Sequence, residues 1–149
     1  MNYINGDATK PIGDGDKIIV HICNNLGKWG AGFVLAISKK WSEPRQEYLK
    51  LIKYKLGHVQ IVQVSDDIYV ANMICQNGIN GKNKIFKNRV DYDALERCIR
   101  KVYKFAKQNN MSIHMPLIGA GLAGGDWNKI ENIIEKHISN VNTYVYKFD

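Results

Sequence analysis

The hydrophobic positions along the chain predict strands that alternate with helices. Nearly continuous apolar runs at 18–23 and 113–118 are typical of strands buried on both faces of a sheet. The segments 59–64 and 69–74 also have strand character, and the polar residues between them predict a hairpin. A last apolar run at 141–148 predicts a strand that closes the chain.

Helical spacing of apolar residues appears in four other segments. It begins at 33–37, and a second helix is expected over 43–55. Asp91 is placed to cap a helix whose apolar stripe runs through 95–105, and isoleucines at 130–138 share one face of a fourth helix. This alternation, with one hairpin, predicts an α/β fold in three layers, α/β/α, around a mostly parallel mixed sheet.

The length and composition favour one globular domain over residues 1–149. The chain is 45% hydrophobic, and it has no apolar stretch of the ~20 residues that a bilayer span needs. Its polar start shows no signal peptide. Cys23, Cys75 and Cys98 fit neither a disulfide framework nor a CxxC metal pattern, and the four histidines are scattered. We therefore expect a cytoplasmic protein with reduced thiols, no membrane contact and no metal.

The charge balance favours anionic partners without choosing among them. The chain has 21 basic and 14 acidic residues, for a net charge of +7. The excess lies mostly in 39–55 and 82–89. Both segments lie outside the glycine-rich loops described next, so we interpret them as solvated faces rather than a nucleic-acid surface.

Two glycine-rich loops carry the clearest sign of chemistry. The run 119–125 follows the strand at 113–118 and precedes a helix, and the run 27–32 stands in the same position after the strand at 18–23. Such loops let backbone N–H groups approach an anion, and the following helix adds the positive end of its dipole. Two loops of this kind could hold the two phosphates of a diphosphate. The alternative is that each glycine serves only a tight turn or the start of a helix.

Other glycine motifs do not fit the chain. Gly119, Gly121 and Gly124 match a dinucleotide-binding fingerprint, but only one helix and one strand fit between Gly124 and Asp149. A dehydrogenase fold needs a second mononucleotide-binding half. The P-loop pattern is absent as well.

The same loops resemble those of macrodomains, an α/β family that binds ADP-ribose. The start at 5–9 resembles the family's first loop, and 18–32 is similar to the subgroup around the yeast ADP-ribose-1″-phosphate phosphatase. The run 114–127 is similar to bacterial and phage members of that subgroup, which process ADP-ribose-1″-phosphate. The resemblance covers nearly the whole chain. It implies binding of ADP-ribose and hydrolysis of a 1″ derivative, with the 1″-phosphate as the first choice and no cofactor.

The resemblance also implies a set of ligand-binding residues. Asp7 would accept a hydrogen bond from the adenine amino group, and Tyr146 would flank the adenine. By themselves these residues fit a turn and an ordinary core tyrosine equally well. The full set is Asp7, Ala8, Asn24, Asn25, Trp29, Gly30, Ala31, Gly32, Phe33, Ile118, Gly119, Ala120, Gly121, Leu122, Ala123 and Tyr146.

Two residues are candidates for catalysis. His21 lies in an apolar strand just before the loop expected to face the distal ribose, and a histidine can take and give a proton at neutral pH. It could activate water, or it could be a buried histidine satisfied by the backbone. Asp126, at the end of the second glycine loop, could orient a water or contact a ribose hydroxyl. Its alternative role is the N-cap of the following helix.

Two other functions stay open from the sequence. The chain could be a module that binds ADP-ribose without turnover. It could also deacylate O-acyl-ADP-ribose or remove ADP-ribose from a protein or nucleic acid, with the basic loop 82–89 engaging the macromolecule. The related glycohydrolases use a lysine and an aspartate where this chain has Gln76 or Asn77, and Ala123, so their mechanism is not expected here. We expect a monomer whose partner is ADP-ribose, a 1″ derivative or an ADP-ribosylated macromolecule.

Overall fold

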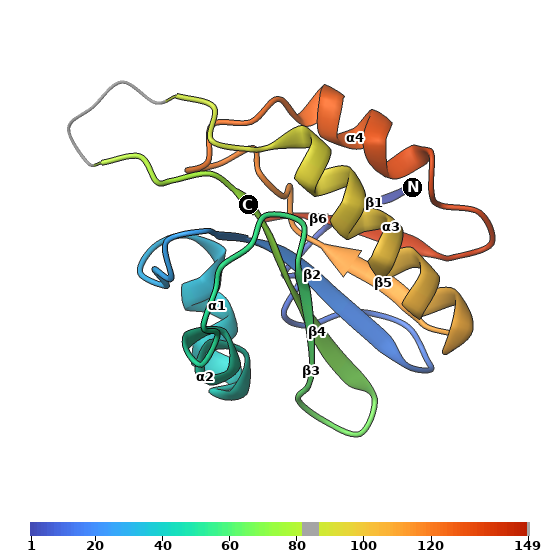
Figure 1. Ribbon diagram of the computed structural model, residues 1–149. Helices are drawn as coiled ribbons and strands as arrows, with labels where there is room; N and C mark the ends of the chain where they lie inside the picture. The colour runs from blue at the N-terminus through green and yellow to red at the C-terminus, as the bar shows by residue number, and fades with distance from the viewer. Residues whose placement is uncertain (82–86, 149) are drawn as a thin grey trace.

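Strands and helices alternate along the chain, as the hydrophobic pattern predicts (Figure 1). The structure is a computed structural model that describes residues 1–81 and 87–148. Its elements are β1 Asn2–Asn5, β2 Lys17–Asn24, α1 Phe33–Lys40, α2 Glu43–Leu49, β3 Val59–Gln63, β4 Ile68–Gln76, α3 Tyr92–Gln108, β5 Ser112–Met115, α4 Trp127–Glu135 and β6 Thr143–Lys147.

The six strands form one mixed sheet in the order β1-β6-β5-β2-β4-β3. Every neighbouring pair is parallel except β3 and β4, which form the antiparallel hairpin expected from the sequence. The mostly parallel sheet is therefore confirmed. The long strand β2 lies inside the sheet between β4 and β5, which explains why its sequence is almost continuously apolar.

Helices cover both faces of the sheet, which confirms the three layers (Figure 1). Alternate residues of β2 point to opposite faces. Ile18 and Val20 enter the core under α3 and α4, whereas Ile19 and Cys23 enter the core under α1 and α2. The expected cap of α3 is also confirmed, because the Asp91 carboxylate accepts a hydrogen bond from the following helix.

Two helices are shorter than the sequence pattern suggests. The helix expected over 43–55 ends at Leu49, where the N–H of Lys50 and that of Leu51 bond to carbonyls three residues back and close the last turn tightly. Leu51 and Tyr54 still pack into the core under α1 and α2, so their apolar character reflects burial and not helix. The helix α4 likewise ends at Glu135. Within the described ranges, no helix has the length and apolar character needed to cross a membrane.

The connections around β2 and β5 position the site. These strands are parallel neighbours, but the chain leaves β2 for α1 on one face and β5 for α4 on the other (Figure 1). Diverging connections of this kind open a crevice beyond the carboxyl ends of the strands, where open α/β sheets bind their ligands. Both glycine-rich loops border this crevice.

Candidate functional site

Three adjoining cavities form one cleft along the carboxyl edge of the sheet. The central cavity, about 280 Å³, lies between the two glycine-rich loops. A second cavity of about 590 Å³, here called the Asp7 cavity, shares Phe33 and Pro116 with it. A third of about 420 Å³, the Asn24 cavity, shares Ile22 with the central one. The cleft therefore suits an extended ligand with a compact middle.

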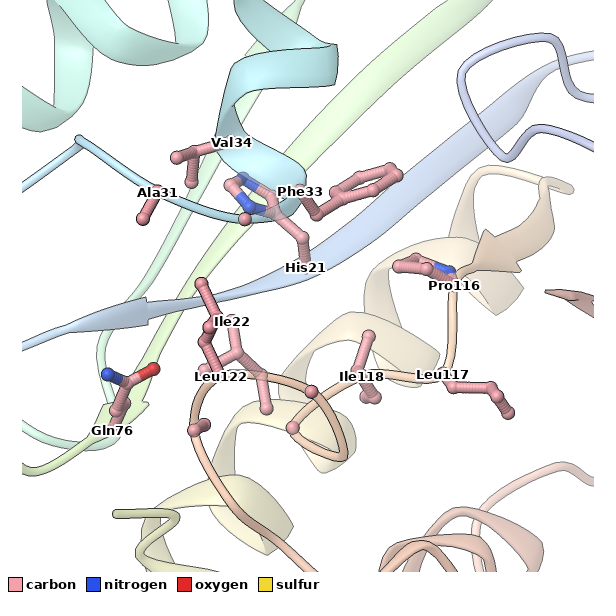
Figure 2. A pocket seen from close by; sticks show the side chains of 14 residues that line it. His21, Ile22, Ala31, Phe33, Val34, Gln76, Pro116, Leu117, Ile118 and Leu122 are labelled. Atoms are coloured by element: carbon pink, nitrogen blue, oxygen red, sulfur yellow. The ribbon is translucent and has the colours of Figure 1, made fainter. Parts of the chain in front are cut away.

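Unpaired backbone N–H groups border the central cavity on two sides. The cap of α1 is Gly32, which brings no side chain to the first turn of the helix. Among the described residues, no hydrogen bond uses the N–H groups of 31–34 or of 121–123. Figure 2 shows these two segments on either side of β2. Two rows of free donors in residues that line one cavity form an arrangement that can bind anions.

Glycine serves different purposes at different positions of the two loops. Gly119 has a positive φ of 73°, and a Cβ there would come within 2.9 Å of Ile130. Gly30 and Gly121 have neither a positive φ nor any atom within 4 Å of an added Cβ, yet each lines the cleft. The fold thus requires glycine at 119, whereas at 30 and 121 the missing side chain leaves room in the cleft.

His21 forms part of the wall of the central cavity as a neutral imidazole. The amide of Asn72 donates to Pro44 O and Gln60 Oε1, so its oxygen faces His21 Nε2 at 2.6 Å. Nε2 therefore carries the proton and Nδ1 presents a lone pair. Burial lowers the pKa of His21 to about 4, against a smaller upward effect of the Asn72 hydrogen bond. At neutral pH His21 is therefore a neutral imidazole with Nδ1 as its proton acceptor, and its role in catalysis stays a prediction.

His21 Nδ1 is the one buried side-chain nitrogen or oxygen in residues 1–81 and 87–148 that lacks a hydrogen-bond partner. The ring packs edge-on against Trp29, with 5.4 Å between centroids, and beside Phe33 at 6.0 Å. Trp29 itself is only 8% exposed and donates its indole N–H to Ser38. It supports His21 from the core and lines none of the three cavities.

The Asp7 cavity combines a carboxylate with aromatic walls. Asp7 Oδ1 accepts from the backbone and the hydroxyl of Thr9, at 2.9 and 2.7 Å. Partial burial works to raise the pKa of Asp7, but these bonds and nearby lysines outweigh it and hold the pKa below its usual value. Tyr146 and Phe148 also line this cavity, together with the buried Ala8.

The hydroxyl of Tyr146 joins three parts of the chain. It accepts from Ile12 N at 2.9 Å and lies 2.7 Å from Nδ1 of the buried His114. The ring can therefore form a fixed wall of the Asp7 cavity, while the loop that carries Asp7 is tied to β6. Lys40 adds a second tie, because its ammonium donates to Thr9 O at 2.7 Å.

The side chains of Asn24 and Asn25 are engaged in loop structure. Asn24 accepts from the backbone N–H groups of Leu26 and Lys28 and donates to Lys28 O. Asn25 bridges to the loop after β4 by bonding to Asn77 and to the N–H of residue 78. Asn24 lines its cavity, but Asn25 lines none of the three. Their contact with a distal ribose stays a prediction.

Asp126 is exposed and caps α4. Its carboxylate accepts from Asn128 N at 2.9 Å, and it lines none of the cleft cavities. No contact among the described residues supports a catalytic role for Asp126, so that role stays a prediction. Ile118, Gly119, Leu122 and Ala123 line the central cavity, whereas Ala120 does not, and their contact with a ligand stays a prediction.

The structure also places residues in the cleft that the sequence did not propose as ligand-binding. Phe148 is 79% exposed beside the Asp7 cavity, and Pro116 separates that cavity from the central one. Gln76 lies between the central and Asn24 cavities, and Lys39 borders the Asp7 cavity. No local motif marks these residues, because strands far apart in sequence bring them together. The described residues contain no cluster of three or more His, Cys, Asp or Glu that could hold a metal.

Comparison with known families agrees with this geometry. The family model described as "Macro domain" matches residues 20–134, which include both glycine-rich loops, the whole of β5 and most of β2. The chain is a macrodomain. A solved macrodomain protein from Streptomyces coelicolor is 38% identical to it, with a TM-score of 0.83 and 97% coverage of each chain.

Curated relatives of this macrodomain carry different names. The mouse chromodomain-helicase-DNA-binding protein 1-like is 30% identical over 162 residues, which cover 99% of this chain but 18% of the mouse protein. An ADP-ribose 1″-phosphate phosphatase of Candida albicans is 27% identical, with 98% of each chain covered. A Trypanosoma brucei macrodomain solved in complex with ADP-ribose has the same fold at 16% identity, with a TM-score of 0.65 and coverage of 98% and 62%.

Proposed function

We propose that this macrodomain binds ADP-ribose along the cleft. The adenosine half occupies the Asp7 cavity, the diphosphate lies in the central cavity, and the distal ribose extends into the Asn24 cavity. One observation carries the proposal: a compact cavity bordered by two rows of free N–H groups lies between two larger ones. Each hydrogen bond from a backbone N–H to a charged phosphate contributes about 1.5–3 kcal/mol. The Trypanosoma complex supports the choice of ligand.

Asp7 supplies the selectivity for adenine in this proposal. Because Thr9 occupies Oδ1, the other carboxylate oxygen is left to accept from the adenine amino group. The lowered pKa keeps the carboxylate ionised at neutral pH. Phe148, Tyr146 and Phe33 offer apolar surfaces to the flat base.

Calorimetry tests the proposal. ADP-ribose is expected to bind, and AMP and ribose 5-phosphate to bind more weakly, because each fills only part of the cleft. Asp7→Asn keeps an oxygen for Thr9 and puts an amide donor in place of the free oxygen, so ADP-ribose affinity should fall about tenfold or more. Asp14→Asn, in the same loop but outside the cleft, serves as the control. If titration with ADP-ribose produces no heat of binding, the proposal is wrong.

Hydrolysis of ADP-ribose-1″-phosphate is a second candidate function. The Candida relative bears that activity in its name, and the lone pair of His21 Nδ1 is a proton acceptor in the wall of the central cavity. Nδ1 has no accessible surface in this structure, so catalysis requires the segment 30–34 to shift. Phosphate release should then be lost in His21→Gln while ADP-ribose affinity stays within about threefold. The same assay with O-acetyl-ADP-ribose and ADP-ribosylated protein or DNA tests the other leaving groups.

A further inference from the structure

A row of cations lies on the exposed face of α3, outside the cleft. Arg97, Arg100, Lys101, Lys104 and Lys107 are all exposed, and no acidic residue interrupts the sequence between the first and the last. Their spacing of three and four residues places them on one side of the helix. At 1.5 Å per residue the row is about 15 Å long. We call it the α3 basic face.

A cavity beside this face gathers two more basic groups. It measures about 530 Å³ and is lined by Lys55 and His58 together with Arg97 and Lys101. Arg97 Nη2 donates to Leu56 O at 3.3 Å, and Lys101 Nζ donates to a carbonyl of the same loop at 2.7 Å. The loop passes close under the arginine because residue 57 is glycine: a Cβ there would lie 2.8 Å from Arg97 Nε. The loop and the helix thus hold these cations side by side.

These positive charges form no close ion pairs in the part of the chain that the structure describes. The ion pairs within 4.0 Å between described residues use Lys17, Lys50, Lys136 and His137, and none uses a cation of the α3 basic face or Lys55. Glu96 is near enough to Arg100 for the two charges to interact, but the five cations of the face outnumber this carboxylate and still produce a positive potential that attracts anions. The group of cations also costs some stability through repulsion, which an anionic partner would relieve.

We propose that the α3 basic face binds the phosphate backbone of a nucleic-acid strand. Five cations in a row of about 15 Å can meet successive phosphates of one strand, whereas a small anion would meet only one or two of the cations. The residues exposed between 97 and 107 are all cations, so the face offers no apolar anchor of the kind that protein interfaces use. The proposal does not depend on ADP-ribose binding, because none of these residues lines the cleft.

Fluorescence anisotropy with a labelled 20-nucleotide single-stranded DNA tests the proposal on the full chain. The double variant Arg97→Gln/Lys101→Gln should weaken binding about tenfold at 0.15 M salt. It should also reduce the slope of log K against log salt concentration by about 1.4, since each lost phosphate contact removes about 0.7. Excess ADP-ribose should leave DNA binding unchanged.

The matched control is Arg45→Gln/Lys50→Gln, in α2 and at its C-cap, which removes the same charge from exposed positions on the opposite layer. It should retain affinity within about twofold. Equal weakening in both variants would mean that net charge alone is responsible, and this would overturn the proposal. So would failure of the unmodified chain to bind DNA at 0.15 M salt, or equal binding of poly-glutamate. Thermal denaturation should show both variants folded at the assay temperature, although the α3 variant loses hydrogen bonds to the loop at 56–57 and the control variant loses the ion pair of Lys50 with Glu47.

Discussion

At the scale of single residues, burial decides the charge of two histidines. It lowers the pKa of His21 to about 4, and burial followed by the nearby Lys17 does the same for His114. An unfolded histidine titrates near 6.5. Between pH 6.5 and 4 the unfolded chain therefore binds protons that the folded chain does not, so stability falls as pH falls through this window.

As the pH falls from 6.5 to 4, we expect each histidine to lower the free energy of unfolding by up to about 3 kcal/mol. Urea denaturation at pH 7.5, 6.0 and 4.5 measures it. His21→Gln preserves a donor for Asn72 and removes one titrating group, so the pH dependence should be roughly halved. The same pH dependence in His21→Gln as in the parent would show that His21 titrates normally in the fold. Carboxylates such as Asp7, whose pKa is lowered, add to the loss only at the acid end.

Substitutions at Asp126 can distinguish its structural role as a helix cap from a role in catalysis. Because it caps α4 and lies outside the cleft, Asp126→Ala should destabilise the protein by about 1 kcal/mol and leave ADP-ribose affinity unchanged. Asp126→Asn retains a capping oxygen and should restore most of the stability. Denaturation and calorimetry on both variants give the result. A loss of turnover in Asp126→Asn at parental stability would instead support the catalytic role.

At the scale of elements, the second glycine-rich loop contains two kinds of glycine. Gly119→Ala forces a side chain into a left-handed conformation and against Ile130, so we expect a loss of about 1–3 kcal/mol in stability. Gly121→Ala meets open space at a negative φ and should change stability by no more than about 0.5 kcal/mol. Its methyl group narrows the central cavity, so ADP-ribose affinity should fall about tenfold.

Thermal denaturation and calorimetry distinguish the two substitutions. The expected pattern is a binding defect without instability at position 121 and instability at position 119. If Gly121→Ala binds ADP-ribose as the parent does, the diphosphate does not lie against this loop. Gly30→Ala provides a second test of the same kind, since that glycine borders the Asn24 cavity on the opposite loop.

At the scale of the whole molecule, the sheet joins two separate cores. Trp29 lies in the core under α1 and α2, and Trp127 packs against the core under α3 and α4. The proposed ligand contacts loops from both layers. We expect ADP-ribose at 100 times its dissociation constant to stabilise the fold by about 2.7 kcal/mol, sensed equally by both tryptophans.

Fluorescence-detected unfolding of two single-tryptophan variants checks this expectation. Trp41→Phe combined with Trp127→Phe leaves Trp29, and Trp29→Phe with Trp41→Phe leaves Trp127. The transitions of the two variants should each shift upward with ligand by the same free energy. A shift confined to one probe would mean that the ligand stabilises only one layer and that the layers do not unfold together.

The sequence by itself determined the order of strands and helices, the hairpin, the cap of α3 and the two glycine-rich loops. These features are local: they depend on apolar periodicity, on turn residues and on backbone freedom, and all of these can be read within a few positions. The ends of the helices could not be read from this pattern. Leu51 and Tyr54, for example, continue the apolar pattern because they pack against the core, although they lie beyond the end of α2.

Only the tertiary structure decided which residues of the site face the cleft. It engaged Asn24 and Asn25 in loop contacts, buried Trp29 behind His21 and placed Asp126 at the helix cap. It also brought Phe148 to the cleft from the far end of the chain. Side-chain direction and the partners of a buried polar atom depend on neighbouring strands and helices that are distant in sequence. The protonation of His21 is the clearest case, because Asn72 on the adjacent strand and burial by the α1 layer set it together.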